Sequence, residues 1–575
     1  MAEENTPPRE LGRTLLAQLG ALTGGLAVDD YLRAWWEWYS RIAGRPDGSV
    51  ALVRSALERW LDLARFSAQA AAGLPLSPGG DDLGFAGAAW ALWPFNVYAR
   101  AYQDWVAWLA DAFKAGAEQP RAAPASLERL RFATQLLTDA FSPANYLLTN
   151  PELIERTVAE SGQNLLRGLN NWLEDAERMA RGGPRGAGRY QIGKDVAVTP
   201  GKVIFRNRLI ELIQYEPQTE KVFAEPVLIL PAWIMKYYIL DLSPRNSLVR
   251  YLVEKGHTVF IVSWRNPTTT DRDLGLDDYV QLGFLAALDA AERTVAGQKV
   301  HAVGYCIGGT LLAIGAALLA GRGDARLATV TLLAALTDFS EPGELSVFIS
   351  PSQLAVLEAV MYREGVLDSE RMATAFALLR SRELIWKPAV DAYVRGERPS
   401  LNELMAWNAD GTRMPWRMHS EYLERLYWRN ELARGEFSAC GRVIDLHDIV
   451  VPLYVVGTET DHVAPWRAVY KVRELTRSRD FTFLLTSGGH NAGIVSGPSH
   501  PRRRYRAQSS HRPAEMPSAE AWQEQAAEVS GSWWPAWQSW LAAHSSAELE
   551  PGRKIAAASP TGEPLEDAPG RYVHG

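Results

Sequence analysis

The sequence predicts an α/β fold, in which a largely parallel sheet is covered by helices and preceded by a helical region. From about residue 195 onward, short apolar runs alternate with helical segments, which is typical of a parallel sheet. The first ~200 residues are rich in alanine, leucine and arginine and lack strand-like alternation. One cysteine, Cys306, lies in a glycine-rich turn directly after a strand-like run. These three observations predict a helical region followed by an α/β region that contains Cys306.

Six apolar runs are expected to form the main strands of the sheet. Helices are expected in most of the intervals, for example over 247–255, 278–296 and 309–319. Between the fourth and fifth strands, residues 338–448 carry little strand signal, and we expect them to form a cap or lid over a site. The six predicted strands are Pro226–Leu230, Thr258–Ser263, Val300–Gly304, Ala328–Ala334, Pro452–Gly457 and Phe481–Leu485.

The chain is expected to divide into three parts. Residues 1–195 form a helical, tryptophan-rich N-terminal domain, and a polar, glycine-rich stretch at 181–188 marks its boundary. Residues 196–545 form the α/β domain with the cap inserted at about 338–448. Residues 546–575 are expected to be a mobile tail, although Tyr572 could pin its end.

Composition limits the function classes that the chain can serve. The 60 basic and 67 acidic residues leave a net charge of −7, which gives no support to nucleic-acid binding. Two cysteines exclude a disulfide scaffold and suit a reducing cytoplasm. The N-terminus is acidic and polar, unlike a signal peptide, and no run reaches the ~18 apolar residues of a membrane span.

The chain contains 21 tryptophans, which is an unusual number. Many of them lie in the helical region, within residues 31–39 and 90–108. One interpretation is a docking face for a partner or an apolar phase, and the other is an ordinary helical core with aromatic ridges.

Residues 304–309 read Gly-Tyr-Cys-Ile-Gly-Gly and come directly after the run 300–303. This is the strand–nucleophile–helix turn of α/β-hydrolases, with Cys306 where serine usually stands. A side chain at Gly304 or Gly308 would crowd the backbone of such a sharp turn. A thiolate accepts and donates acyl groups well, so the motif indicates acyl transfer through a thioester. A buried free cysteine at a strand-to-helix turn is the alternative.

The base and its orienting group are expected on loops after later strands, in the order acid then histidine. Asp461 comes after the fifth predicted strand, and His490 comes after the sixth in a Gly-Gly-His sequence. Glu459 and Asp445 are rivals for the acid. Cys440 has no glycine turn and is interpreted as structural. The predicted catalytic set is therefore Cys306, Asp461 and His490.

The oxyanion hole is expected to use two backbone N–H groups. One belongs to Ile307, the residue after the nucleophile. The other belongs to the loop after the first predicted strand, where Ile234 is the candidate and Trp233 the alternative.

The motifs together resemble those of the polyhydroxyalkanoate synthases, most closely class I. The matching stretches run in order from about residue 200 to the end of the chain. They are 231–242 (PAWIMKYYILDL), 262–267 (VSWRNP), 304–309 (GYCIGG), 461–466 (DHVAPW), 489–495 (GHNAGIV), 531–537 (GSWWPAW) and 569–573 (PGRYV).

The resemblance implies that a (3R)-hydroxyacyl-CoA, such as 3-hydroxybutyryl-CoA, acylates Cys306 and releases CoA. His490 would deprotonate Cys306, and Asp461 would help His490 to activate the 3-hydroxyl of the next monomer. It further implies a homodimer in the cytoplasm that binds the growing polyester granule, along with phasin-type granule proteins. No metal is expected, and no cofactor besides the CoA carried by the substrate.

Two stretches depart from the pattern of the class. The cap stretch 407–419 is closer to medium-chain synthases, and Asn491 stands where isoleucine is common. Trp407 of the cap is a candidate substrate-binding residue. Arg502 and Arg503 are candidates for holding CoA phosphates, although a solvated basic loop is an alternative.

Two other functions fit parts of the sequence. A thioesterase or polyhydroxyalkanoate depolymerase would use water in place of the monomer hydroxyl, but a cysteine nucleophile under a large cap favours transfer. A non-catalytic granule-associated protein would use only the tryptophan-rich region, and the intact Cys306, Asp461 and His490 set argues against it.

Overall fold

The computed structural model describes most of the chain, and the α/β body is almost continuous in it. The residues described are 12, 14, 16–18, 26–74, 76–79, 84–117, 125–180, 190–398, 401–547, 549–555 and 566–575. The glycine-rich stretch 181–188, expected as a domain boundary, lies outside them.

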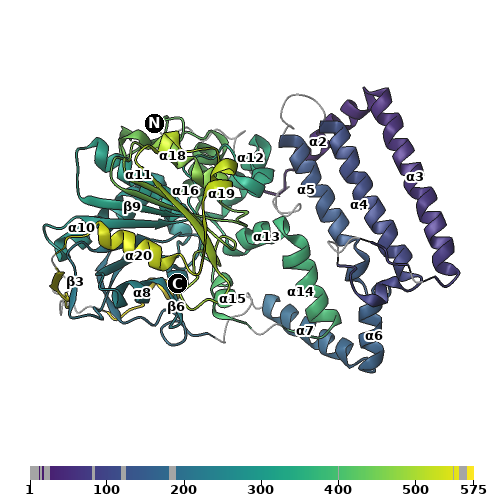
Figure 1. Cartoon of the computed structure of the whole chain (residues 1–575), viewed down its shortest axis with the longest axis horizontal. Coiled ribbons are helices and arrows are strands. Elements are labelled where there is room, and N and C mark those ends of the chain that lie inside the picture. The colour runs from purple at the N-terminus through teal and green to yellow at the C-terminus, as the bar shows by residue number, and fades with distance from the viewer. Residues whose placement is uncertain are drawn as a thin grey trace.

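A sheet forms the centre of the body (Figure 1). It has ten strands, in the order β1-β2-β7-β4-β8-β9-β14-β15-β16-β17. The six strands from β7 to β15 run parallel, and the two further strands at each edge pair antiparallel with their neighbours. The parallel strands are β4 (Val227–Leu230), β7 (Val259–Trp264), β8 (Val300–Tyr305), β9 (Leu327–Leu333), β14 (Leu453–Thr458) and β15 (Phe481–Thr486). The α/β fold and the six predicted strands are confirmed.

The antiparallel edge strands were not among the predicted strands. They are β1 (Gly201–Arg206), β2 (Ile210–Tyr215), β16 (Arg504–Ser510) and β17 (Glu528–Ser530). β16 alternates between exposed and half-buried residues, and four of its seven residues are arginine or serine. A strand with so few apolar residues gives little periodic signal.

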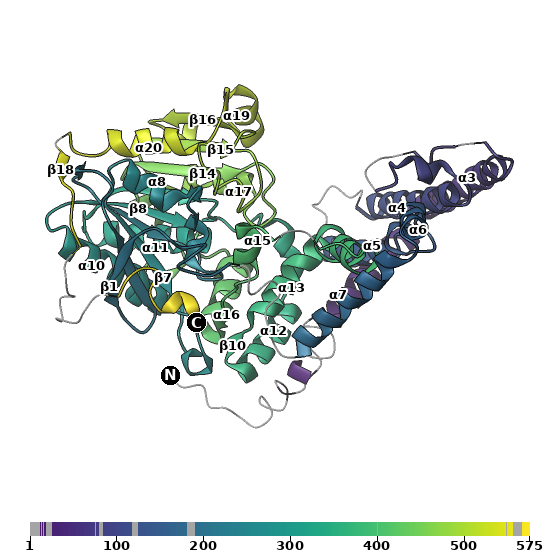
Figure 2. The same ribbon diagram turned by 90° about the horizontal axis from the view of Figure 1, so that it is seen from below.

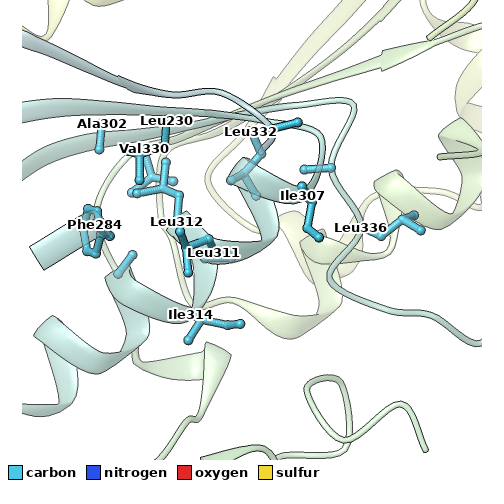
Figure 3. Close-up of a cluster of buried hydrophobic side chains, with 14 of the residues drawn as sticks. Leu230, Phe284, Ala302, Ile307, Leu311, Leu312, Ile314, Val330, Leu332 and Leu336 are labelled. Atoms are coloured by element: carbon cyan, nitrogen blue, oxygen red, sulfur yellow. The ribbon is translucent and has the colours of Figure 1, made fainter. Parts of the chain in front are cut away.

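Both faces of the sheet are buried, as a parallel sheet requires. In β4, Leu228 and Leu230 belong to the core on one face, and Val227 and Ile229 belong to the core on the other. Helix α11 (Ile307–Gly321) is apolar on all sides and fills the centre of the first core (Figure 3). The nucleophile motif is thus built on the most deeply buried helix of the body.

Further helices cover the two faces of the sheet. α10 continues from the π-helical turn η5, and α20 carries three of the tryptophans of the second core or its edge. The helices of the body are α8 (Leu248–Glu254), α9 (Leu276–Asp278), η5 (Tyr279–Leu285), α10 (Ala286–Thr294), α17 (Trp466–Tyr470), α18 (Val472–Leu475), α19 (Ala519–Gln525) and α20 (Trp534–Ala543).

The segment between β9 and β14 is helical, with a two-stranded sheet, β10-β11 (Val366–Leu367, Met414–Pro415), and a short hairpin, β12-β13 (Ser438–Ala439, Arg442–Val443). It covers the predicted cap, residues 338–448. Its helices are η6 (Gly343–Phe348), α12 (Pro351–Glu364), α13 (Ser369–Leu379), η7 (Arg382–Trp386), α14 (Lys387–Ala389), η8 (Val390–Val394), α15 (Glu403–Asn408), α16 (Trp416–Glu421) and η9 (Tyr422–Trp428).

The N-terminal helices form an arm that projects from the body, with cap helices between them and the sheet (Figures 1 and 2). Phe132 of the arm packs with Val347 and Leu379 of the cap, and Asp30 accepts a hydrogen bond from Ser350. The helices of the arm are α2 (Val28–Ala43), α3 (Pro46–Ala71), α4 (Phe95–Ala117), α5 (Ala125–Ala140), α6 (Pro151–Ala159) and α7 (Gln163–Ala180). The arm is therefore seated on the cap.

The described parts of the tail make defined contacts with the body. β18 (Leu549–Pro551) pairs with β3 (Lys221–Phe223), and residues 566–575 lie along β1 and β2. The hydroxyl of Tyr572 donates to the carbonyl of Asn207 at 2.6 Å. Tyr572 thus lies where a pin for the end of the chain was expected.

None of the helices among the described residues combines the length and the apolar character needed to cross a bilayer.

Candidate active site

Cys306 lies at the turn between β8 and α11, with backbone angles φ +56° and ψ −129°. A non-glycine residue at positive φ is strained, and such strain persists only where the surroundings enforce it. Here the backbone N–H of Cys306 donates to Leu333 of β9 at 2.9 Å, and its carbonyl accepts from Gly309 at 2.8 Å. The turn therefore holds the thiol at the carboxyl ends of the parallel strands.

The glycines of the motif are required by close backbone contacts. A Cβ at Gly304 would lie 2.4 Å from Cα of Gly309, and a Cβ at Gly308 would lie 2.3 Å from the carbonyl oxygen of Leu230. Neither distance can be accommodated, because the neighbour is backbone in both cases. The predicted crowding is confirmed, and it comes from packing against β4 and α11.

Asp461 and His490 meet on the loops after β14 and β15. Nδ1 of His490 lies 2.8 Å from Oδ2 of Asp461. The same carboxylate accepts from the Thr458 hydroxyl at 2.8 Å and from the backbone N–H groups of Val463 and Ala464 at 2.9 and 2.8 Å. These donors fix the carboxylate, which in turn fixes the ring and leaves Nε2 for the thiol.

The charge balance of the site favours an ionised pair. Burial alone would lower the pKa of His490, but the negative charges and hydrogen bonds of Asp461 and Cys306 raise it well above its ordinary value. Burial would raise the pKa of Asp461, but the charge and hydrogen bond of His490 lower it. The structure thus brings Cys306, Asp461 and His490 together with the imidazole stabilised as a cation.

The rival acids have other partners. Glu459 pairs with Arg504 at 2.8 Å, and Asp445 caps a short turn and contacts His447 at 2.9 Å. Cys440 lies at positive φ in the β12-β13 hairpin, where burial raises the pKa of its thiol.

The expected oxyanion donors belong to α11, which follows the turn at Cys306 (the nucleophile elbow), and to the loop after β4. Ile307 is the first residue of α11, and the first N–H groups of a helix have no partner within it. The loop after β4 is held by the cap, because Thr412 donates its N–H to the carbonyl of Ile234 at 3.1 Å and its hydroxyl to that of Trp233.

Two cap tyrosines, which were not among the residues predicted from the sequence, interact electrostatically with the nucleophile. Burial and then the neighbouring charges, including that of Cys306, raise the pKa of Tyr422. Burial raises the pKa of Tyr427 despite a lowering hydrogen bond from Tyr422, and Cys306 and Asp461 raise it further. Tyr422 also lines an apolar cavity of about 10 Å³ beside Ile307. In the sequence, only the clustering of aromatic residues within 416–428 could have indicated these two tyrosines.

The candidate substrate-binding residues lie in three different settings. Trp407 is only 3% exposed, and its indole N–H donates to the carbonyl of Lys236 at 2.7 Å. The guanidinium of Arg503 donates to the carbonyls of Ser487 and Ala492 at 3.2 and 2.7 Å. Trp407 and Arg503 therefore brace the loops around the site, whereas Arg502 is exposed.

Among the residues that the structure describes, no three histidine, cysteine, aspartate or glutamate side chains gather closely enough to hold a metal ion.

Comparison with known proteins assigns the chain to a family. A family model described as the poly-beta-hydroxybutyrate polymerase (PhaC) N-terminus matches residues 81–252, and one for the alpha/beta hydrolase fold matches residues 225–496. The PhaC subunit of the poly(3-hydroxyalkanoate) polymerase of Rhizobium etli is 38% identical over 87% of this chain and 78% of its own. The corresponding subunit of Cupriavidus necator is 38% identical over 86% of this chain and 83% of its own. The poly(3-hydroxyalkanoate) polymerase of Methylorubrum extorquens is 41% identical over 77% of this chain and 73% of its own. The chain belongs to the poly(3-hydroxyalkanoate) polymerase family.

Proposed function

We propose that this polymerase builds a polyester from (3R)-hydroxyacyl-CoA through a thioester on Cys306. One observation supports the proposal above all. Cys306, strained at the elbow, interacts with the imidazole of His490, which in turn is hydrogen-bonded to the fixed carboxylate of Asp461. The pair of His490 cation and Cys306 thiolate is the form that attacks a thioester.

In the first step the thiolate of Cys306 attacks the carbonyl carbon of the acyl-CoA. The backbone N–H groups of Ile307 and Ile234 stabilise the oxyanion that forms. When the C–S bond to CoA breaks, the departing sulfur takes the proton from His490. The products are a hydroxyacyl thioester on Cys306 and free CoA.

In the second step the next acyl-CoA supplies the nucleophile. Its 3-hydroxyl gives its proton to His490 while its oxygen attacks the thioester carbonyl, and the Cys306 thiolate leaves. The lengthened chain is now a CoA thioester. Attack by Cys306 on that thioester returns the chain to the enzyme and releases CoA.

The surroundings of Cys306 favour transfer over hydrolysis. Tyr422 and Tyr427 of the cap interact electrostatically with Cys306, and both are at least nine-tenths buried. Excluding water removes the acceptor that would release free hydroxy acid.

CoA release and product size, measured together for (3R)-hydroxyacyl-CoAs of increasing length, test the proposal. We expect polymer to form as CoA is released, and the length profile to identify the monomer class. Cys306→Ala should abolish both, whereas the matched control Cys440→Ala should retain both. CoA release that yields only free hydroxy acid would instead identify a thioesterase.

We also propose that the arm binds the polymer granule. It exposes large aromatic side chains on α2 and α3, with Trp36 and Trp60 each 63% exposed and Trp35 stacked on Tyr39 at 5.4 Å. Aromatic side chains in contact with water favour an apolar surface. The double change Trp36→Ser and Trp60→Ser should reduce co-sedimentation with polymer granules about tenfold. The control Val443→Ser, exposed on the cap hairpin, should leave it unchanged.

A further inference from the structure

The residue before the nucleophile contacts the ring of the catalytic histidine. Tyr305 ends β8 and is only 2% exposed. Its ring stacks on the imidazole of His490, with centroids 5.6 Å apart and planes inclined by 26°. An aromatic face beside an imidazolium is attractive, because the ring quadrupole is negative above its plane.

The hydroxyl of Tyr305 contacts the loop that carries His490. It donates to Oδ1 of Asn491 at 2.6 Å, and it lies 3.5 Å from the carbonyl oxygen of His490. One side chain next to Cys306 therefore contacts both the ring and the backbone region of the base. Asn491 can accept this hydrogen bond, whereas an isoleucine at this position could not.

The other supports of the loop act from different directions. Asp461 holds Nδ1 of the ring, Arg503 holds the carbonyls of Ser487 and Ala492, and the Trp533 indole donates to the carbonyl of Gly493 at 3.0 Å. None of these three contacts connects the loop to the elbow. The hydrogen bond from Tyr305 to Asn491 makes that connection.

We infer that Tyr305 and Asn491 are positioning residues that fix His490 relative to the sulfur of Cys306. The inference rests on the proposed role of His490 as the base. The distance between base and nucleophile must hold within a few tenths of an ångström for proton transfer, and misplacement by about 1 Å can cost 10²-fold in rate. The ionisable groups that act on the ring are Asp461, Cys306 and His462.

A double-mutant cycle tests the link. Tyr305→Phe keeps the stacked ring but loses the donor, and Asn491→Ile loses the acceptor. Each change should lower kcat about tenfold with KM unchanged. The double variant should be no slower than either single one, because all three lack the same hydrogen bond. Independent losses that multiply to about 100-fold would overturn the inference.

A second measurement needs no substrate. The rate at which iodoacetamide alkylates Cys306 is monitored by mass spectrometry as a function of pH, with Cys440 as the internal reference. A displaced imidazolium stabilises the thiolate less, so the midpoint for Cys306 should rise by about 0.5 pH in Tyr305→Phe. A residue with only a structural role would lower the melting temperature and leave this midpoint unchanged, which would also overturn the inference.

The matched control is Tyr470→Phe. Tyr470 is 2% exposed, and its hydroxyl donates to the carbonyl of Pro517 at 3.1 Å. This variant should keep the wild-type kcat and midpoint. A shifted midpoint in an enzyme that forms no polymer from any acyl-CoA would refute the proposed function and leave the positioning role standing.

Discussion

Asp461 accepts hydrogen bonds on both of its oxygen atoms, and only one of its partners is His490. Its importance should differ between the two chemical steps. A thiol (~8.5) and an imidazole (~6.5) have close pKa values, so the ion pair forms with little help. An alcohol is a far weaker acid, so the carboxylate should matter more when the hydroxyl attacks.

Asp461→Asn should therefore slow chain elongation about 100-fold and slow the first acylation of Cys306 much less. Rapid-quench measurement of the first CoA released, set against the later rate of polymer growth, separates the two steps. Equal losses in both would contradict this division.

Among single residues, those placed directly after a strand can be predicted from the sequence, and those that reach the site through a long insertion cannot. Cys306, Asp461 and His490 each lie directly after a recognisable strand, so the parallel sheet brings them together. Tyr422 interacts with Cys306 only because of the path that the cap takes through space. From the sequence, Arg503 is a candidate for binding a charged ligand. In the structure its guanidinium donates to backbone carbonyl groups, and the sequence contains no pattern from which those contacts could be predicted.

Among the elements, the cap is held on one side by the arm. Asp139 of α5 is 1% exposed and accepts from the Ser381 hydroxyl at 2.5 Å and from Arg382 of η7 at 3.0 Å. A buried carboxylate with charged and neutral donors contributes about 1.5–3 kcal/mol to the contact.

Asp139→Asn should weaken this contact by about that amount and increase amide exchange in η7. The control Asp62→Asn changes an exposed carboxylate that pairs with Arg65 within α3 and should leave exchange in η7 unchanged. If the two variants exchange alike, Asp139 does not hold the cap.

The cap also contains a neutral buried histidine. Burial lowers the pKa of His419 to about 3. The unfolded chain, with a pKa of ~6.5, binds more protons between these two values, so stability is full above pH 6.5 and falls as the pH drops. The cost at pH 5 is about 2 kcal/mol.

His419→Leu should reduce the loss of unfolding free energy between pH 7.5 and pH 5 by about 2 kcal/mol. Urea unfolding at the two pH values measures it. The control His511→Leu removes an exposed histidine and should behave as the wild type. An unchanged pH dependence in His419→Leu would show that His419 becomes protonated in the folded cap.

Over the whole molecule, the last described residues close the edge of the sheet. The carboxylate of Glu211 in β2 is fully buried and accepts from Arg206 at 2.7 Å and from the backbone N–H groups of Arg571 and Tyr572, both at 3.0 Å. The sequence predicts that Tyr572 could pin the end of the chain. The carboxylate that accepts from its backbone N–H belongs to Glu211, more than 350 residues earlier, and no local sequence pattern connects the two positions.

Removing residues 566–575 should lower the unfolding free energy by about 2–4 kcal/mol, because the Glu211 carboxylate loses two donors. Urea unfolding measures the loss. Glu211→Gln should destabilise the full chain more than the shortened one, since only the full chain supplies those donors. Equal effects in both would show that Arg206 alone satisfies the carboxylate.

The arm is seated on the cap, and this gives the molecule a definite route for mechanical load. Among the described residues, the packing contacts that pass a pull on α2 or α3 toward the α/β body run through α12, η7 and η8, so along this route the cap lies between the arm and the sheet. Parts connected in series carry the same force, and the softest of them deforms most. When the arm adheres to a surface, the resulting force should therefore displace the cap before it strains the sheet that holds Cys306.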